Sequence, residues 1–334
     1  MINRFIFFIY YLKELDLKKI RRFQKYVKNN YKKSYLSQTI DAIDSTFRYN
    51  ISLLDYYYFK FFALKKSERL LYAGTGFMYE YQLKMNPKES RNILENKILF
   101  LKAYKTFTNR LSASIEEIKN NKNIAEELLS VHNYLLVLKN AMGQVGAEVE
   151  IVSTKDFNYE TLLTYMIANN YDLIEQFIIQ HDKLMALSPS GLNTIRVITQ
   201  IKGSEVIIIG ARLRISINSH VDNMAAGNAA APIDLKTGKL FGSAVYSDIT
   251  KQDFTTHPIT GIEIIGFQIP FWKETLEMIT KAAAAHPENK SIGWDVAISN
   301  DGPQLVEGNH NWCKLLWQLP VKKGLKKELE IFLE

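Results

Sequence analysis

The chain has 334 residues, of which 47% are apolar and 23% charged, and its formal net charge is +7. This composition is typical of a folded globular protein of about two domains, and it excludes collagen-like repeats and long disordered tails. The single cysteine, Cys313, excludes an internal disulfide and a thiolate metal cluster, and it is compatible with a cytoplasmic location.

The basic charge is concentrated at the N-terminus. Residues 1–33 hold ten Lys or Arg against Glu14 and Asp16, a net charge of +8, which leaves −1 for the rest of the chain. A body of that charge argues against an extended nucleic-acid surface. The apolar run 5–12 is shorter than the roughly 20 residues of a membrane span. The basic segment 1–33 either contacts an anionic membrane surface or packs on the body as a solvated helix.

The apolar periodicity predicts a change from helices to strands along the chain. Residues 1–125 read as mostly helical. The aromatic cluster 56–62 reads either as a stacking platform or as core and wall of a substrate lobe. The later segments alternate as strands or recur at helical spacing. The predicted strands are 134–139, 148–152, 172–179, 196–202, 205–209, 211–217, 292–299 and 304–307, and the predicted helices are 158–170, 273–285 and 322–333.

The richest chemical signal is a predicted hairpin near the C-terminus. If residues 300–302 form its turn, Asp295 lies opposite Glu307, with Cβ atoms about 5 Å apart. Asn309 shares the face of Glu307, because strand side chains alternate with a period of two. Two carboxylates and an amide are oxygen ligands that suit Mg²⁺. The alternative is an exposed hairpin whose acids face water, but the flanking apolar residues favour a buried one.

Two further segments fit a nucleotide. Lys139 ends a strand and precedes a loop with Gly143 and Gly146, where backbone amides can approach phosphates. Glu175 and Asp182 flank the apolar segment 176–179, which could wall an adenine ring while a carboxylate binds the ribose. An ordinary glycine loop and an ordinary strand remain the alternatives.

Three arginines lie within one predicted meander: Arg196, Arg212 and Arg214. Arg212 and Arg214 share a face. Guanidinium groups inside a β-core need anionic partners, and phosphate is a frequent bidentate one.

Taken in order, these pieces resemble the ATP-grasp superfamily, whose members end on an acid followed about a dozen residues later by Glu-x-Asn. Within it, the chain looks like a member of the sugar-transfer-associated ATP-grasp family over roughly residues 85–320. The motifs that carry this resemblance are Asn193-Thr194-Ile195-Arg196, Val221-Asp222-Asn223, the segment 234–238, His257-Pro258-Ile259-Thr260-Gly261, Ile269-Pro270 and Gly293-Trp294-Asp295.

The resemblance implies an α+β, ATP-grasp fold in three parts. These are a helical N-terminal region over 1–127, a small lid lobe over 128–172, and an antiparallel-sheet core lobe with the metal site over 173–334.

The resemblance also implies roles for individual residues. Lys97 and Lys139 would bind the phosphates of ATP, together with the Gly143–Gly146 loop. Glu175 and the backbone of Gln176, Phe177 and Ile178 would hold adenine, and Asp182 the ribose. Asp295, Glu307 and Asn309 would hold two Mg²⁺, or Mn²⁺ in their place. Arg196, Arg212 and Arg214 are the catalytic candidates. Asp222, Asn223 and His257 would face the acceptor, although structural turn roles are equally open for them.

One position departs from the D-alanine ligase branch of the superfamily. Gly293 stands two residues before the metal-binding aspartate, where that branch has an arginine, so either Arg212 or Arg214 takes that role or it is done differently.

The activity implied is that of an ATP-dependent carboxylate–amine ligase working through an acyl phosphate. Its substrates would be a small molecule or glycan with a carboxylate, and an amine, in capsule or lipopolysaccharide biosynthesis. The location would be the cytoplasm or the inner face of the plasma membrane. The alternatives are an ATP-dependent sugar kinase and a non-catalytic, nucleotide-binding accessory of glycosyltransferases.

Overall fold

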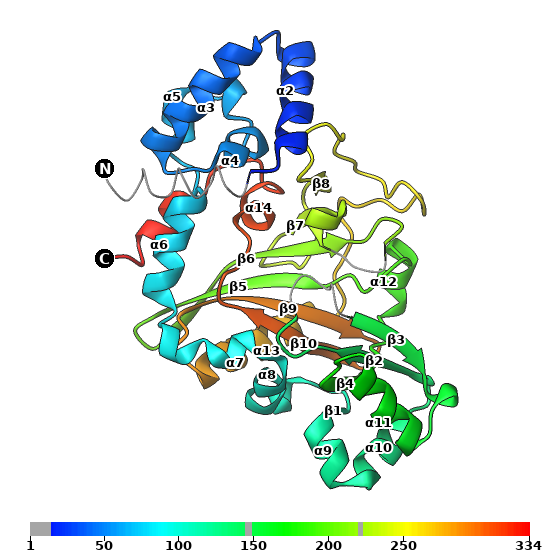
Figure 1. Cartoon of the computed structure of the whole chain (residues 1–334). Coiled ribbons are helices and arrows are strands. Elements are labelled where there is room, and N and C mark those ends of the chain that lie inside the picture. The colour runs from blue at the N-terminus through cyan, green and yellow to red at the C-terminus, as the bar shows by residue number, and fades with distance from the viewer. Residues whose placement is uncertain (1–14, 144–148, 220–222) are drawn as a thin grey trace.

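The computed structural model describes residues 15–143, 149–219 and 223–334. Within them, two antiparallel sheets lie next to each other, and a helical region stands at the end of the large sheet that is remote from the small one (Figure 1). The small sheet has the strand order β1-β4-β2-β3, and the large sheet has the order β10-β9-β5-β6-β7-β8. The two sheets bring together residues that the chain separates by more than a hundred positions.

The N-terminal region is helical because its apolar side chains recur on one face of each helix. Its longer helices are α2 (Leu17–Tyr31), α3 (Tyr35–Tyr49) and α6 (Thr75–Met85), with the short α4 (Leu53–Tyr58) and α5 (Lys66–Arg69) between them. Phe23 and Val27 of α2 are fully buried against the aromatic cluster of residues 56–62, which is confirmed as core. Two more short helices, α7 (Asn92–Glu95) and α8 (Lys97–Ala103), lead to the small sheet.

The small lobe combines four short strands with three helices. The strands are β1 (Ser112–Ser114), β2 (Leu135–Lys139), β3 (Val149–Ser153) and β4 (Leu173–Gln176), and the helices are α9 (Ile115–Asn120), α10 (Lys122–Leu129) and α11 (Tyr159–Ala168). Alternate residues of β2, such as Leu136 and Leu138, pack against these helices, so Lys139 points to the opposite face. Because β1 and β4 belong to this sheet, the lobe reaches beyond the expected range 128–172 at both ends.

The large sheet carries the second core. Its strands are β5 (Ile195–Lys202), β6 (Glu205–Ile215), β7 (Ala229–Ile233), β8 (Val245–Tyr246), β9 (Ser291–Ser299) and β10 (Gly302–Asn309). Apolar side chains on one face of β5, β6 and β9 pack on α13 (Trp272–Ala285). The intervening side chains face the other side, and on these strands they include Arg196, Arg214 and Asp295. Burial therefore forces these charged groups to pair with one another.

Three predicted elements differ from the structure. Residues 205–215 form a single strand through Gly210, because a bulge opposite Ile198 and Thr199 absorbs the irregularity there. The closing helix predicted over 322–333 is only α15 (Lys326–Glu330), and α14 (Lys314–Gln318) precedes it. Strand β4 ends at Gln176, and the predicted strand 172–179 gives way to a loop before α12 (Asp182–Leu187). The predicted α+β class is confirmed.

Among the described residues, no helix has both the length and the apolar character needed to cross a lipid bilayer.

Candidate active site

The hairpin of β9 and β10 brings Asp295 directly opposite Glu307, which confirms the predicted pairing. The turn is tighter than predicted, since Ser299 pairs with Gly302 across two residues. Left uninterrupted, that tighter register would place Val306 opposite Asp295. A bulge between Leu305 and Glu307 adds one residue and restores the alignment of the two carboxylates.

Asp295 is held as an anion by two arginines. Its Oδ1 accepts a bond of 2.5 Å from Arg196 Nε, and its Oδ2 accepts bonds of 3.1 Å from Arg196 Nη2 and 2.6 Å from Arg214 Nη2. Burial alone would raise the pKa of Asp295, but the two guanidinium charges outweigh it and lower that pKa to about 2. Arg214 Nε also donates a hydrogen bond of 2.8 Å to Thr194 Oγ1.

Glu307 has the opposite electrostatics. Burial and then the charge of Asp295 raise its pKa above the ordinary value of 4.5. The Asn309 amide nitrogen donates to Glu307 Oε1 at 3.1 Å and to the Gly293 carbonyl at 3.3 Å. Of these two neighbouring carboxyl groups, Asp295 is ionised, and Glu307 resists ionisation unless a cation compensates its charge.

This donor set fits a magnesium ion shared with a phosphate ligand. The described residues contain no group of three or more His, Cys, Asp and Glu side chains that could hold a metal. Two carboxylates and the oxygen of the Asn309 amide are nonetheless enough, since Mg²⁺ is usually bound through one or two carboxylates, substrate phosphates and water.

Arg212 lies in the same row but points elsewhere. The row runs across the sheet through Glu307, Asp295, Arg196 and Arg212. The guanidinium of Arg212 donates instead to the Trp317 carbonyl, at 2.6 Å from Nη2 and 3.1 Å from Nε. Burial lowers its pKa to about 10. The structure therefore gathers Arg196 and Arg214 around Asp295, whereas Arg212 anchors α14.

Close packing explains why position 293 is a glycine. A Cβ at this position would lie 2.5 Å from Trp312 Cβ and 3.1 Å from Arg196 Cδ. An arginine here would collide with both neighbours. Arg214 reaches the same aspartate from β6, with its Nη2 2.6 Å from Asp295 Oδ2.

Across from this row, the small sheet carries a second buried charge cluster. Glu175 is 3% exposed and accepts bonds from Lys139 Nζ at 2.9 Å and Arg110 Nε at 2.5 Å. Burial opposes its ionisation, but the charges of Arg110 and Lys139 lower its pKa to about 2. Glu175 thus neutralises Lys139 in the described state rather than leaving either charge unpaired.

Arg110 joins the two clusters and was not found from the sequence. Its Nη1 donates 2.6 Å to the Leu305 carbonyl, at the start of the β10 bulge that positions Glu307. Its Nη2 is buried without a hydrogen-bond partner among the described residues. A lone arginine after a helical segment belongs to no motif, so no pattern in the sequence distinguishes it from a surface residue.

Lys97 begins α8, and the loop after β2 surrounds its ammonium group. Its Nζ donates to the carbonyls of Asn140 at 3.2 Å, Ala141 at 3.5 Å, and Gly143. Burial lowers the pKa of Lys97, the charge of Glu307 opposes that change, and repulsion from Lys139 adds to it. Lys97 and Lys139, which are expected to bind phosphate, thus interact electrostatically with each other, and Lys97 also with Glu307, which is expected to bind the metal.

The segment predicted to hold adenine connects the two sheets. The Phe177 amide donates to the Leu135 carbonyl at 3.2 Å, and its carbonyl accepts from Asn133 Nδ2 at 3.0 Å. Asp182 is exposed, and its Oδ1 accepts a bond of 3.2 Å from Asn300 at the β9–β10 turn. Gln176 and Ile178 are partly buried neighbours on this segment.

The two acceptor candidates among the described residues, Asn223 and His257, lie outside helices and strands. His257 is buried, and its ring nitrogens contact the Ser216 carbonyl at 3.3 Å and the Thr260 amide at 3.3 Å, so it holds its own loop. Asn223 caps the short helix that follows it by accepting from the Ala225 amide. Asp222 and Gly146, which were also predicted, lie outside the described residues.

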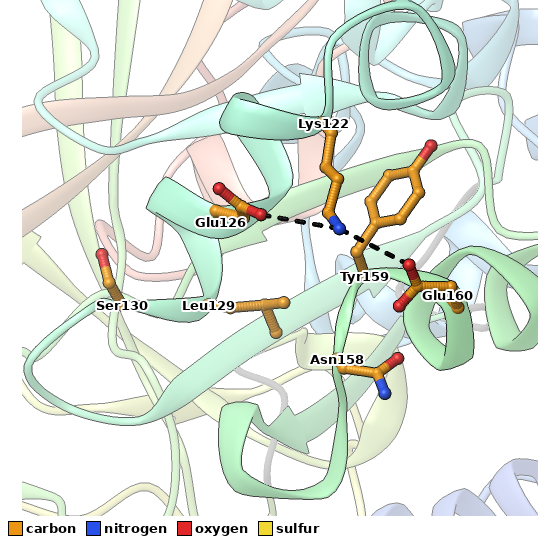
Figure 2. Close-up of a pocket in the computed structure, with 7 residues that line it drawn as sticks. All are labelled: Lys122, Glu126, Leu129, Ser130, Asn158, Tyr159 and Glu160. Atoms are coloured by element: carbon orange, nitrogen blue, oxygen red, sulfur yellow. Dashed lines mark hydrogen bonds and ion pairs between the residues drawn. The ribbon is translucent and has the colours of Figure 1, made fainter.

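A shallow hollow on the outside of the small lobe contains none of the predicted residues (Figure 2). Its basic group, Lys122, already lies 3.8 Å from Glu126 and 3.5 Å from Glu160. The one cation among the described residues that line it is therefore already paired with two acids, so the hollow offers no free positive charge to a phosphate.

The chain belongs to the sugar-transfer-associated ATP-grasp family, since the model of that family matches residues 77–333. It therefore has the ATP-grasp fold, as its sequence motifs indicated. No curated protein matches the chain in sequence.

Solved structures similar to this chain include three enzymes of low sequence identity. Biotin carboxylase from Campylobacter jejuni has 12% identity and a TM-score of 0.45 over 73% of this chain and 47% of its own. D-alanyl-alanine synthetase A from Vibrio cholerae has 13% identity and a TM-score of 0.40, over 74% of this chain and 62% of its own. L-amino acid ligase from Bacillus licheniformis has 11% identity and a TM-score of 0.38, over 66% of this chain and 41% of its own. The chain thus spans less than half the length of two of these three.

Proposed function

We propose that this chain is an ATP- and Mg²⁺-dependent carboxylate–amine ligase that forms an amide in cell-surface polysaccharide biosynthesis. The observation that carries the proposal is the meeting of two charge clusters from different sheets. Asp295 and Glu307 lie opposite each other on the large sheet, and Arg110, which is bonded to Glu175 of the small sheet, donates to the Leu305 carbonyl at the bulge before Glu307. One side suits a metal, and the other suits the phosphates that the metal would share.

In the proposed reaction, a substrate carboxylate oxygen attacks the γ-phosphorus of ATP, and the bond to the ADP oxygen breaks. An amine nitrogen then attacks the acyl carbon of the acyl phosphate. The bond between that carbon and the phosphate oxygen breaks, phosphate leaves with its electron pair, and the nitrogen loses a proton. No protein nucleophile is required. Asp295, Glu307 and Asn309 would hold Mg²⁺, which would neutralise charge on the phosphates when bound.

The other residues of the proposed site position and neutralise charge. Lys97 and Lys139 would exchange their present carbonyl and carboxylate partners for phosphate oxygens. Arg196 and Arg214 keep Asp295 ionised and lie where guanidinium donors could stabilise the transferring phosphoryl group. Gln176, Phe177 and Ile178 would contact adenine, and Asp182 the ribose. We infer that the substrates combine a sugar acid with an amino compound, or an amino acid with an amino sugar.

The test is incubation of the full chain with ATP, Mg²⁺ and pools of sugar acids and amino acids, with hydroxylamine present. A ligase gives hydroxamate together with ADP, because hydroxylamine traps the acyl phosphate. A phosphorylated sugar without hydroxamate would favour the kinase, and ATP binding without ADP release under any pool would favour the accessory protein.

Glu307→Gln provides the matched loss of function. We expect it to lower the rate by on the order of a hundredfold or more while the fold persists, since charge stabilisation supplies most of such catalysis. Asp301→Asn, an exposed acid in the turn of the same hairpin, is the control and should keep the activity. Equal turnover by the Glu307 variant and the control, at saturating Mg²⁺, would remove Glu307 from the site.

A further inference from the structure

The outer face of α2 carries a stripe of basic side chains. The helix buries Phe23 and Val27, and its exposed cations recur three or four residues apart, which places them on one side. They are Lys18, Arg21, Lys25 and Lys28, and exposed Lys32 follows at the end of the helix.

Helix α3 carries an aliphatic stripe that the described residues leave partly to largely exposed. It buries Ala42 and Thr46 on one side. On the other side, Leu36 is 70% exposed, Ile40 is 60% exposed and Ile43 is 38% exposed. Their spacing of four and three residues makes them a single row along the helix.

The two stripes adjoin along the contact between the helices. Gln24 Nε2 donates to Thr39 Oγ1 at 3.3 Å, and Lys28 Nζ lies 4.7 Å from the ring centroid of exposed Tyr35. The basic stripe, Tyr35 and the aliphatic stripe therefore form one surface, which we call the α2–α3 face. Both helices stand at the end of the molecule opposite the small lobe (Figure 1), so this surface is remote from the candidate active site.

The charge of the α2–α3 face is poorly compensated. Within the described ranges, none of the five cations of the stripe forms an ion pair with a carboxylate. The acids of α3 are engaged by other arginines: Asp41 lies 2.6 Å from Arg69, and Asp44 lies 2.7 Å from Arg48. A row of aliphatic side chains beside unpaired cations is thus available to a ligand that is both apolar and anionic.

We propose that the α2–α3 face docks on an anionic lipid bilayer. Lipid phosphates would bind the basic stripe, Tyr35 would lie at the level of the headgroups, and the aliphatic stripe would enter the acyl boundary. A nucleic acid would satisfy the cations but would leave Leu36, Ile40 and Ile43 without an apolar environment. The inference is independent of the ligase reaction, because no residue of the candidate active site takes part.

The test is co-sedimentation of the full chain with vesicles of phosphatidylcholine, alone or with phosphatidylglycerol, at low and at physiological salt. Two variants change the α2–α3 face at exposed positions: Lys25→Glu with Lys28→Glu, and Leu36→Ser with Ile40→Ser. The matched controls lie elsewhere on the surface: Lys273→Glu with Lys281→Glu on α13, and Ile167→Ser on α11, where Ile167 is 54% exposed. Circular dichroism and thermal melts check that all four proteins fold.

We expect binding that requires phosphatidylglycerol and weakens with salt. Each face variant should partition onto these vesicles at least about tenfold less than the unchanged chain, as the loss of two basic or two apolar contacts implies. The controls should bind like the unchanged chain. Equal binding by both face variants would overturn the proposal, and so would loss in the charge variant alone, which is the result expected for a soluble polyanion or a non-specific contact.

Discussion

The buried ion pair between Arg110 and Glu175 can be tested apart from any activity. Arg110→Met removes a cation 2.5 Å from a carboxylate that is 3% exposed, and it leaves Lys139 as the remaining cation bonded to Glu175. Breaking a buried pair typically costs about 3–5 kcal/mol. The lowered pKa of Glu175 agrees in direction, because the charges of Arg110 and Lys139 stabilise its anion against the effect of burial.

A double-mutant cycle isolates this interaction. Arg110→Met and Glu175→Gln should each lower the free energy of unfolding by about 3 kcal/mol or more, and the double variant by clearly less than their sum. Urea unfolding followed by tryptophan fluorescence measures all four proteins. The matched control is the surface pair of Lys322 and Asp253, at 2.7 Å, for which a coupling below about 1 kcal/mol is expected.

A coupling below about 0.5 kcal/mol between Arg110 and Glu175 would refute the reasoning, since that is the ordinary error of additivity. Lys139 would then be the cation that stabilises the Glu175 charge. The direction in which stability changes with pH provides a second check. The lowered pKa of Glu175 means that its contribution to stability is present above its unfolded pKa, near 4.5, and is lost as the pH falls toward 2.

Three further predictions concern Lys139, Glu307 and Gly293. Lys139→Ala should weaken ATP binding, measured by calorimetry, more than it lowers the melting temperature, because Arg110 still neutralises Glu175; unchanged affinity would contradict this. Without metal, burial and the charge of Asp295 raise the pKa of Glu307, so its contribution to stability is present below its unfolded pKa and is lost as the pH rises. The increase in melting temperature by Mg²⁺ over EDTA should therefore grow as the pH rises above 4.5, and a flat profile would contradict it. Gly293→Ala should cost about 1–3 kcal/mol in urea unfolding, because the added Cβ meets Trp312 at 2.5 Å, and a neutral result would mean that Trp312 can move.

The sequence alone determined the elements with a strong local signal. Period-two alternation and a turn with Asn and Gly predicted the hairpin that places Asp295 opposite Glu307, and the motifs around it indicated the family. Helix α13 was likewise predicted from its helical periodicity, because a long amphipathic pattern needs no partner to be recognised. The short α15 was overestimated, since helical propensity cannot show where tertiary packing ends a helix.

Which charges meet depends on tertiary contacts between elements far apart in the sequence. Arg196, Arg212 and Arg214 are equivalent in the sequence, yet strand register and the position of Trp317 direct Arg212 away from Asp295. Arg110 carries no motif, and its role follows from the approach of Leu305 on a strand almost two hundred residues later. Ion pairs depend on distances of a few ångström between elements remote in the chain, and local patterns of apolar and polar residues do not encode those distances.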